Sequence, residues 1–270
     1  MTQPLLTRRA LAEDIAALGV REGDVVMAQA ALRRIGPMLN GPDALIGAIR
    51  DVIGPEGTLL GYADWDALYE VDEAGRPDEK LRADIPPFDI TASRCARDNG
   101  AFVEFLRTTP GTQRSANPGA SMLALGARAD WFVADHPLNY GYGEGTPFAK
   151  IVEAGGKVLM AGAPHDTMTL LHHAEHLARL PDKRIVRRET PFATPRGVEW
   201  RMIEEFNTSI PVVGDPARNH FAELVAAFIE TGLAREGLIG AGPSLLVEAR
   251  DILPFAIDWL ERELTDSPSP

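Results

Sequence analysis

Apolar residues recur at two alternating periods along the first 65 positions of the chain. Leu11, Ile15 and Leu18 are spaced four and three residues apart after Thr7, which predicts a helix with a hydroxyl N-cap. The pattern then predicts a strand at 24–28, a helix opening at Gly41–Pro42 and a strand at 57–62. Helix and strand in this order predict a layered α/β fold.

The same two periods predict the elements of the remaining chain. Strands are expected at 121–125 and 157–162, and a hairpin over 185–203 around Thr194–Pro195–Arg196–Gly197. Helices are expected at 100–108, from Thr146–Pro147, and near 168–179, 219–231 and 254–263. No repeat or linker divides the sequence, which predicts a single domain over 1–270.

Residues 64–98 interrupt this order. The segment is charged, contains Pro and Gly, and lacks a clear period. Such a long connection inside a compact domain is either a solvated surface excursion or a functional loop.

Charge and cysteine content narrow the function classes. The chain has 27 Lys+Arg against 39 Asp+Glu, a formal net charge of −12, which argues against nucleic-acid and anionic-membrane partners and suits a cationic ligand. Cys95 is the only cysteine, so no intramolecular disulfide is expected and a reducing compartment fits. Neither a signal-peptide pattern nor an 18-residue apolar run is present, which predicts a soluble, cytoplasmic protein.

The richest candidate chemistry lies at His172–His173–Ala174–Glu175–His176. On a helix, His172, Glu175 and His176 share one face, and the preceding strand delivers them at its C-terminal end. Three interpretations compete. The H-x-x-E-H pattern fits a zinc site with a third ligand from downstream, for which the candidates are Glu205, Glu223 and Glu230.

The second interpretation of this helix is a general-base pair. The carboxylate of Glu175 would fix the tautomer of His172 and raise its basicity, leaving the other ring nitrogen to accept a proton. The third interpretation is a helix that carries solvated or hydrogen-bonded histidines without a catalytic role.

Several short motifs, taken together in their order, resemble one family. Thr169–Leu170–Leu171–His172–His173–Ala174–Glu175 is similar to a T-x-L-H-x-A-E motif, and Arg114–Ser115–Ala116–Asn117–Pro118 to an R-S-x-H-P segment. Leu32–Arg33–Arg34–Ile35–Gly36–Pro37 resembles a coenzyme loop, and Thr146–Pro147 stands in place of a Ser-Pro pair. These motifs belong to the aminoglycoside 3-N-acetyltransferases of the antibiotic N-acetyltransferase fold, and the resemblance covers nearly the whole chain.

The resemblance implies a layered α/β/α fold with a mixed sheet, in which residues 64–98 are a long insertion lining the substrate site. It implies acetyl transfer from acetyl-CoA to the 3-amino group of an aminoglycoside antibiotic, giving resistance. Acetyl-CoA is then the co-substrate, the site is free of metal, and the protein is a monomer or a homodimer. No nucleic acid or membrane partner is expected.

The resemblance also assigns site residues. His172 is the general base and Glu175 orients it. The residues expected to hold the coenzyme are Gln29, Ala30, Ala31, Leu32, Arg33, Arg114, Ser115, Ser121 and Thr146. The hydroxyl of Thr146 or a backbone N–H near Ala30 or Ala31 is expected to stabilise the oxyanion. The residues expected to bind the substrate are Trp65, Asp66, Asp89, Glu204 and Glu205, with Asp64 and Glu70 on the same side.

The chain departs from the family pattern at the coenzyme site, which leaves alternatives open. Gln29–Ala30–Ala31 stands where the family has His-x-Ser or His-Ser-Ser, and Asn117 replaces a histidine. A remodelled pocket suggests 2′-N-acetylation of a kasugamycin-type aminoglycoside, or acetylation of a biosynthetic amino sugar or nucleotide conjugate. A zinc hydrolase that uses His172, Glu175 and His176, and a non-catalytic ligand-binding protein, are the remaining alternatives.

Overall fold

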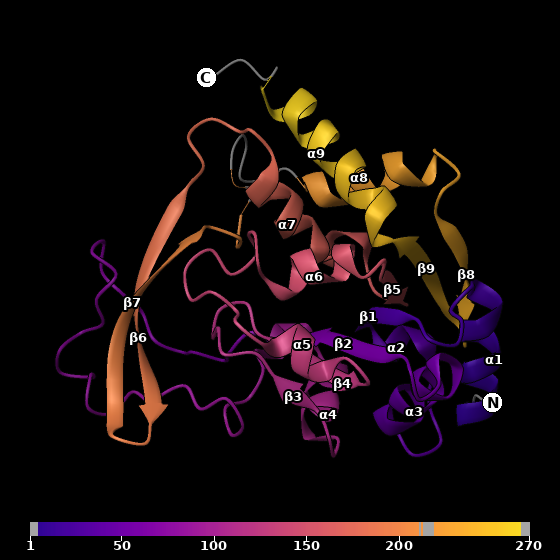
Figure 1. The fold of residues 1–270 in the computed structure, drawn as a ribbon, viewed down its shortest axis with the longest axis horizontal. Coiled ribbons are helices and arrows are strands. Elements are labelled where there is room, and N and C mark those ends of the chain that lie inside the picture. Colours follow the sequence, from indigo (N-terminus) through magenta and orange to yellow (C-terminus); the bar gives the residue numbers. More distant parts are fainter. Residues whose placement is uncertain (1–4, 211, 213–218, 266–270) are drawn as a thin grey trace.

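A seven-stranded mixed sheet forms the centre of the molecule (Figure 1). The computed structural model describes residues 5–210, 212 and 219–265. Three parallel strands occupy the middle, because β1 pairs with both β2 and β5, and the outer pairings are antiparallel. The order across the sheet is β3 (Gln113–Arg114), β4 (Met122–Gly126), β2 (Thr58–Tyr62), β1 (Val25–Ala30), β5 (Lys157–Ala161), β9 (Gly242–Glu248) and β8 (Arg235–Ile239).

Helices cover both faces of this sheet, so the predicted α/β/α layering is confirmed. One face carries α1 (Arg8–Leu18), α2 (Leu32–Ile35), α3 (Pro42–Ile53) and α4 (Ala101–Thr108). The other face carries α5 (Ala129–Val133), α6 (Pro147–Glu153), α7 (Leu170–Leu177), α8 (His220–Ile229) and α9 (Ala249–Thr265).

The side chains of β5 show how the sheet divides the core. Val158 and Met160 belong to one apolar cluster and Leu159 and Ala161 to the other. This is the period of two that sends successive side chains of a strand to opposite faces. A strand buried on both faces therefore reads as a continuous apolar run in the sequence.

Most predicted elements are confirmed, with some shifts at their ends. Thr7 caps α1, since its side chain accepts a hydrogen bond from the Ala10 N–H. The last helix begins at Ala249 rather than 254, and Pro254 lies inside it. The elements that the pattern did not predict are α2, α5, β3, β8 and β9, together with the 3-10 turns Arg97–Asn99 and His165–Thr167.

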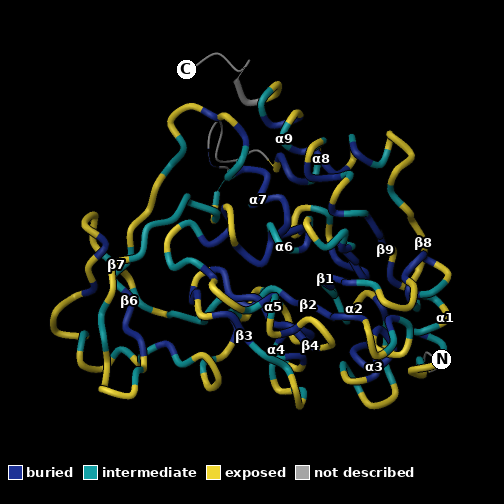
Figure 2. The backbone as a smooth tube through the Cα atoms, in the orientation of Figure 1, coloured by how far each residue is buried: buried dark blue, intermediate teal, exposed yellow. Residues whose placement is uncertain are grey.

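A long hairpin, β6 (Ile185–Thr194) with β7 (Gly197–Phe206), projects from one end of the sheet (Figure 1). The segment 64–98 lies alongside it. Arg82 donates two hydrogen bonds to the Glu189 carboxylate, at 2.7 and 2.8 Å, and Phe88 packs edge-on against Phe192 with ring centroids 6.0 Å apart. The insertion is therefore fastened to the hairpin, although much of both remains exposed (Figure 2).

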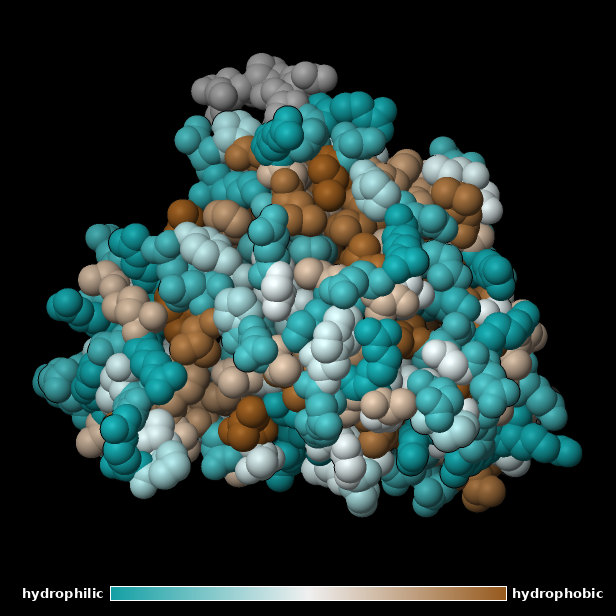
Figure 3. Space-filling view, viewed as in Figure 1, coloured by the Kyte–Doolittle hydropathy of each residue, from teal (hydrophilic) through white to brown (hydrophobic). Residues whose placement is uncertain are grey.

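The face of the surface that Figure 3 shows is largely polar. On the face shown in Figure 3, hydrophilic residues predominate and apolar residues form small groups. None of the helices in the described ranges is long and apolar enough to cross a membrane.

Candidate active site

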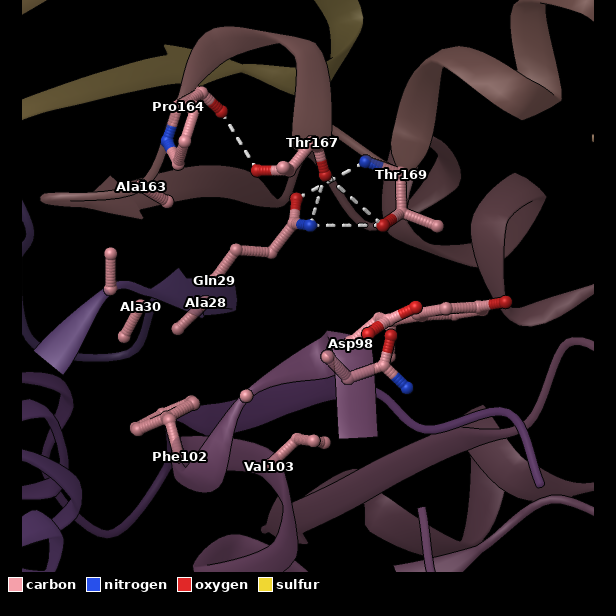
Figure 4. A pocket seen from close by; sticks show the side chains of 14 residues that line it. Ala28, Gln29, Ala30, Asp98, Phe102, Val103, Ala163, Pro164, Thr167 and Thr169 are labelled. Carbon is pink, nitrogen blue, oxygen red and sulfur yellow. Dashed lines mark hydrogen bonds between the residues drawn. The ribbon is translucent and has the colours of Figure 1, made fainter. Parts of the chain in front are cut away.

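A channel opens at the C-terminal end of β1, opposite the start of α4 (Figure 4). Its volume is about 340 Å³. In Figure 4, Gln29 reaches toward Thr167 and Thr169 on one side, while Phe102 and Val103 line the opposite side. The lining is Ala28, Gln29, Ala30, Ala31, Tyr62, Asp98, Asn99, Gly100, Phe102, Val103, Ala163, Pro164, Thr167 and Thr169.

A wider cleft of about 560 Å³ adjoins the channel. The two share Tyr62, Asp98 and Asn99, so these residues mark the junction where the cavities meet. The cleft is walled by the insertion, α7 and the β6–β7 hairpin. Its lining is Tyr62, Asp64, Trp65, Ala67, Asp98, Asn99, Pro118, Gly119, Tyr142, His172, Val186, Arg188, Thr190, Ile203, Glu205, Phe206, Asn207, Thr208 and Ser209.

His172 enters the cleft from the first turn of α7 and is held by a buried carboxylate. Its Nδ1 lies 2.7 Å from Oε2 of Glu175, one turn further along the helix. Glu175 is 1% exposed, and its other oxygen, Oε1, lies 3.0 Å from Nε2 of His220 on α8. Burial alone would raise the pKa of Glu175, but the hydrogen bonds from His172 and His220 lower it to about 2. Because a carboxylate only accepts hydrogen bonds, both histidines donate to it.

Because Nδ1 of His172 carries the proton, Nε2 is the basic nitrogen of the ring, and this ring lines the cleft. The ring packs against Tyr142 and Phe221, with centroids 5.1 and 4.9 Å away. Glu175 and these contacts fix the tautomer and orientation of the imidazole. A general base needs both features.

A second histidine–carboxylate pair lies on the same helix. His176 Nε2 lies 2.7 Å from Oε1 of Glu205, and its Nδ1 donates to the carbonyl of His172 at 2.8 Å. The other Glu205 oxygen accepts the Gly141 N–H at 2.6 Å. Both ring nitrogens of His176 are thus engaged, whereas the carboxylate of Glu205 forms part of the cleft wall.

Gln29 ties the end of β1 to the start of α7. Its Oε1 accepts the Thr169 N–H at 3.1 Å, and its Nε2 donates to the Thr169 hydroxyl at 2.9 Å and to the Thr167 carbonyl. These contacts place the helix start, and with it His172 three residues later. The glutamine therefore has a positioning role and also lines the channel.

Gly100 allows the chain to turn sharply between the junction and α4. Its φ is +79°, a left-handed conformation that favours glycine, and it precedes the first residue of the helix. Gly100 also lines the channel, where an added Cβ would lie 3.8 Å from the Ala30 carbonyl oxygen.

Only part of the predicted coenzyme set lies at the channel. Gln29, Ala30 and Ala31 line it, and Leu32 and Arg33 follow directly in α2. Among the residues that the structure describes, the other four are buried away from its lining: Arg114, Ser115, Ser121 and Thr146.

These four residues have partners within the protein. Arg114 donates to the carbonyls of Ser93, at 2.6 Å, and Ala63, at 2.5 Å. Ser115 pairs with His136 and the Met122 N–H, and Ser121 donates to the Asn117 carbonyl. Their side chains therefore face inward and support the fold.

Two of the three expected oxyanion donors already have partners. The Thr146 hydroxyl is fully buried and caps α6, donating to the Gly143 carbonyl at 2.7 Å. The Ala31 N–H donates to the Ala161 carbonyl at 3.0 Å. Neither group is free to meet a developing negative charge.

Two tyrosine hydroxyls meet beside the junction, that of Tyr62, which lines both cavities, and that of Tyr142, which lines the cleft. The Tyr62 and Tyr142 hydroxyls lie 2.6 Å apart, and each is 3.2 Å from the Gly119 carbonyl. Burial raises the pKa of both phenols, so both hydroxyls remain protonated. Nothing in the sequence indicated that Tyr62 or Tyr142 would lie at the site.

The predicted substrate residues separate into two groups. Trp65 and Glu205 line the cleft, as does Asp64. Within the described ranges, four others do not, and Glu70 is one of them. Asp66 lies 3.8 Å from Arg97, Asp89 accepts hydrogen bonds from its own turn at Thr91 and Ala92, and Glu204 pairs with Arg187 at 2.7 Å.

Asn117, where the family pattern has histidine, has a structural position. Its Nδ2 donates to the carbonyls of Pro137 and Leu138 at 2.7 and 3.1 Å. Its Oδ1 accepts the N–H groups of Gly119 and Ala120 at 2.9 Å. The amide thus joins two loops beside the cleft.

The zinc interpretation does not fit the geometry. His172 and Glu175 bond to each other, and both nitrogens of His176 face protein acceptors. Over the described part of the chain, no group of three or more His, Cys, Asp or Glu side chains is arranged to hold a metal ion. Of the three residues considered as a third zinc ligand, Glu205 is bonded to His176, Glu223 lies on α8, and Glu230 directly follows that helix.

His220 is a buried residue of this site that the sequence analysis missed. It opens α8, directly after the predicted start of that helix, and it is 5% exposed. It lies 45 positions from Glu175, so no local spacing indicates the contact.

Known proteins resemble this chain over nearly its whole length. The family model described as aminoglycoside 3-N-acetyltransferase matches residues 27–261. Aminoglycoside N(3)-acetyltransferase III of Serratia marcescens is 40% identical over 264 residues, covering 95% of this chain and 97% of its own length. Aminoglycoside N(3)-acetyltransferase VIII of Streptomyces fradiae is 38% identical over 266 residues, covering 96% and 93%.

Solved structures agree with these sequences. AAC-IIIb in a binary complex with CoASH is 59% identical, with a TM-score of 0.95 and coverage of 99% of this chain and 100% of that one. AAC-VIa bound to sisomicin is 31% identical, with a TM-score of 0.90 and coverage of 97% and 99%. The chain therefore belongs to the aminoglycoside 3-N-acetyltransferase family.

Proposed function

We propose that this protein transfers the acetyl group of acetyl-CoA to the 3-amino group of an aminoglycoside antibiotic, with His172 as general base. One observation carries the assignment of the base. The imidazole is held by a buried carboxylate on one side and lines the cleft on the other, beside the junction with the channel. Acetylation of the amine removes one of the drug's positive charges and so gives resistance.

The proton transfer follows from this arrangement. An amine at neutral pH is largely protonated and cannot attack a thioester. Nε2 of His172 accepts a proton from the amine, and Glu175 stabilises the imidazolium through Nδ1. The amine nitrogen forms a bond to the thioester carbonyl carbon, the carbon–sulfur bond breaks, and coenzyme A leaves as the thiolate. The nitrogen gives up its second proton to the thiolate, which leaves a neutral amide and the free thiol, and the imidazolium of His172 releases its proton to solvent.

The channel suits the thin arm of the coenzyme. Its walls near the junction are alanines, Phe102 and Val103, and the relative AAC-IIIb was crystallised with CoASH. An acetyl thioester at the inner end of such an arm reaches the junction between channel and cleft. Both cavities are lined there by the polar side chains of Tyr62, Asp98 and Asn99.

The cleft suits a polycation. Among the cleft residues that the structure describes, Asp64, Asp98 and Glu205 are acidic and Arg188 alone carries a guanidinium, and Trp65 offers a flat apolar wall for a sugar ring. Sisomicin is bound by the relative AAC-VIa. Acidic walls that concentrate a cationic antibiotic also raise its rate of encounter.

The alternative substrates have less support. All of the curated relatives named above act at N(3), which favours this position over the 2′-amine of kasugamycin-type compounds and over biosynthetic amino sugars. We place the activity in the cytoplasm, where acetyl-CoA is made. We also propose that residues 1–270 act as one domain, since both apolar clusters pack on one sheet.

Thiol release from acetyl-CoA tests this function. Purified protein is assayed with gentamicin, apramycin and kasugamycin, and the acetylated nitrogen is located by NMR. Release with a 2-deoxystreptamine drug and acetylation at N-3 are expected. Acetylation at another nitrogen, or turnover with kasugamycin alone, would overturn the regiochemistry.

A further inference from the structure

A second cavity adjoins the substrate cleft where β6 begins. It is a groove of about 540 Å³, formed by the insertion turn at 71–73, the first residues of β6 and the segment after β7. We call it the side groove, and its lining is Val71, Asp72, Glu73, Ile185, Val186, Arg187, Arg188, Asn207 and Ser209. The acetyl transfer described above uses the channel and the cleft and leaves this groove without a role.

The side groove and the cleft share part of their walls. Val186, Arg188, Asn207 and Ser209 line both cavities. Among the described residues, none lines both the side groove and the channel, so the two open from different parts of the cleft. A ligand whose reacting amine lies beside His172 can therefore extend past β6 into the groove.

We propose that the side groove binds the terminal diamino sugar of a four-ring aminoglycoside while the ring that is acetylated lies in the cleft. The inference rests on the proposed function and identifies the substrate class that fits the site. The cleft, at about 560 Å³, already has the volume of a site for a drug-sized ligand. A sugar in the groove therefore belongs to a longer molecule than the cleft alone accommodates.

Exposed apolar side chains give the groove a surface for a sugar ring. Ile185 and Val186 are 50% and 44% exposed, and Val71 lines the same groove. A sugar ring has an apolar C–H face between polar edges, and its contact with these side chains removes apolar surface from water. Exposed apolar residues gathered in one cavity indicate a binding surface, whereas residues scattered singly do not.

The turn at 71–73 supplies carboxylates for the ammonium groups of the sugar. Asp72 and Glu73 are adjacent and exposed, and both line the groove. Oδ1 of Asp72 accepts the N–H groups of Ala74 and Arg76 at 2.9 and 2.8 Å, which fixes the position of this carboxylate. A diamino sugar in the groove brings two positive charges to two negative ones.

The two arginines of the groove are engaged by other groups of the protein. Arg187 donates to the Glu204 carboxylate at 2.7 Å, which balances its charge. Arg188 donates to the Tyr69 carbonyl at 2.7 Å, and its guanidinium lies 4.9 Å from the centroid of the Tyr69 ring. The β6 wall of the groove therefore holds its cations in place, and the turn at 71–73 is the acidic wall.

The acidic wall is fastened to the hairpin. Gly75 packs directly on β6, with a φ of +79°, and an added Cβ would lie 2.6 Å from the Arg187 carbonyl oxygen. The Gly75 carbonyl accepts the Glu189 N–H at 2.6 Å, and the Tyr69 hydroxyl donates to the Glu189 carbonyl at 2.9 Å. Because the groove is formed before a ligand enters it, binding there requires little ordering of the chain.

Three drugs that share one core separate the groove from the cleft. Neamine has two rings, ribostamycin adds a ribose, and neomycin adds a diamino sugar to that ribose. The double variant Asp72→Asn with Glu73→Gln keeps a turn-forming oxygen at position 72 and removes both charges. At low ionic strength, we expect kcat/KM for neomycin to fall about 3- to 10-fold, the range for two exposed ion pairs, and the values for neamine and ribostamycin to stay within about 2-fold.

A matched control lies six residues further along the insertion. Asp78 and Glu79 are also adjacent and exposed, and Oδ1 of Asp78 accepts the Lys80 N–H at 2.9 Å, as Asp72 does for Ala74. Neither residue belongs to the described lining of the groove or the cleft. Asp78→Asn with Glu79→Gln therefore changes the net charge by the same amount, and we expect it to leave the ratio of neomycin to neamine kcat/KM within about 2-fold.

Added bulk tests the same groove without a change of charge. Ile185 belongs to the described lining of the groove and not to that of the cleft. Because this side chain is half exposed, Ile185→Trp places its larger ring in the groove rather than in the core. We expect kcat/KM for neomycin to fall at least about 3-fold and that for neamine to stay within about 2-fold.

An unchanged ratio of neomycin to neamine kcat/KM, in either the Asp72 and Glu73 double variant or Ile185→Trp, would overturn the inference. A control at Asp78 and Glu79 that moves the ratio as far as the double variant would also overturn it. The original protein separates this inference from the proposed function. No thiol release with either drug refutes the acetyl transfer itself, whereas release with neamine alone refutes only the role of the groove.

Discussion

Replacing Glu175 with glutamine tests the tautomer on which the proposed mechanism depends. Both carboxylate oxygens accept a hydrogen bond, at 2.7 Å from His172 and 3.0 Å from His220. A glutamine of the same shape has one oxygen and one amide group, so one histidine must face a donor. Either His172 changes tautomer and places its proton on Nε2, or it keeps its tautomer and loses the charge that stabilises the imidazolium.

Both outcomes remove most of the contribution of the base. General-base catalysis contributes about 10²- to 10⁴-fold, and we expect kcat of Glu175→Gln to fall by about 10²- to 10³-fold, which corresponds to about 3 to 4 kcal/mol in the barrier. KM for acetyl-CoA is expected to stay near its original value, because Glu175 lies outside the lining of the channel.

Thiol release at saturating acetyl-CoA and antibiotic measures this change. Glu205→Gln is the matched control, since it also removes a carboxylate bonded to a histidine of α7, but that histidine is His176. We expect the control to raise KM for the aminoglycoside while kcat stays within about 3-fold. A Glu175→Gln enzyme that keeps more than a tenth of its kcat, or an equal loss of kcat in the control, would refute the reasoning.

Three further predictions concern the surroundings of the base. Gln29→Leu removes the link between β1 and Thr169, so kcat and the free energy of unfolding should both fall, the latter by about 1 to 3 kcal/mol in urea titrations; an unchanged kcat would contradict this. Burial raises the pKa of Asp64 to about 6, opposed by the Asn99 hydrogen bond and the Arg114 charge, so the carboxyl becomes charged as pH rises through 6. Calorimetry should show drug binding about 10-fold weaker in Asp64→Asn above pH 7 and equal to the original protein below pH 5. Burial lowers the pKa of His136 to about 4, so its neutral ring stabilises the fold fully above about pH 6.5, and this stability is lost as pH falls toward 4. The melting temperature of His136→Gln should lack that pH dependence. Melting temperatures that fall in parallel with pH in the variant and the original protein would refute this prediction.

Local patterns predicted the contact between His172 and Glu175 because the two residues lie on one helix. A spacing of three residues places His172 and Glu175 on one face, and the structure joins them at 2.7 Å. The contact with His220 spans 45 positions and arises only when α8 packs beside α7. Glu205 likewise reaches His176 across 29 positions, through a hairpin whose sequence reveals nothing about its docking.

Elements without a strong period were missed for a related reason. The helices α2 and α5 have four and five residues, too few for a helical period to repeat. Four of the five residues of β8 are exposed, so no apolar alternation marks it. Motif resemblance located Arg114, Ser115, Ser121 and Thr146 without indicating that their polar groups turn inward.

The most direct test of the central claim is one preparation of His172→Ala, assayed for thiol release and titrated with acetyl-CoA by calorimetry. The imidazole lines the cleft and not the channel, so it should serve the proton transfer without holding the coenzyme. We predict turnover reduced at least about 100-fold, with the Kd for acetyl-CoA within about 3-fold of the original protein. Turnover within 10-fold of the original, or acetyl-CoA binding lost by a folded variant, would contradict the assignment of His172 as the base.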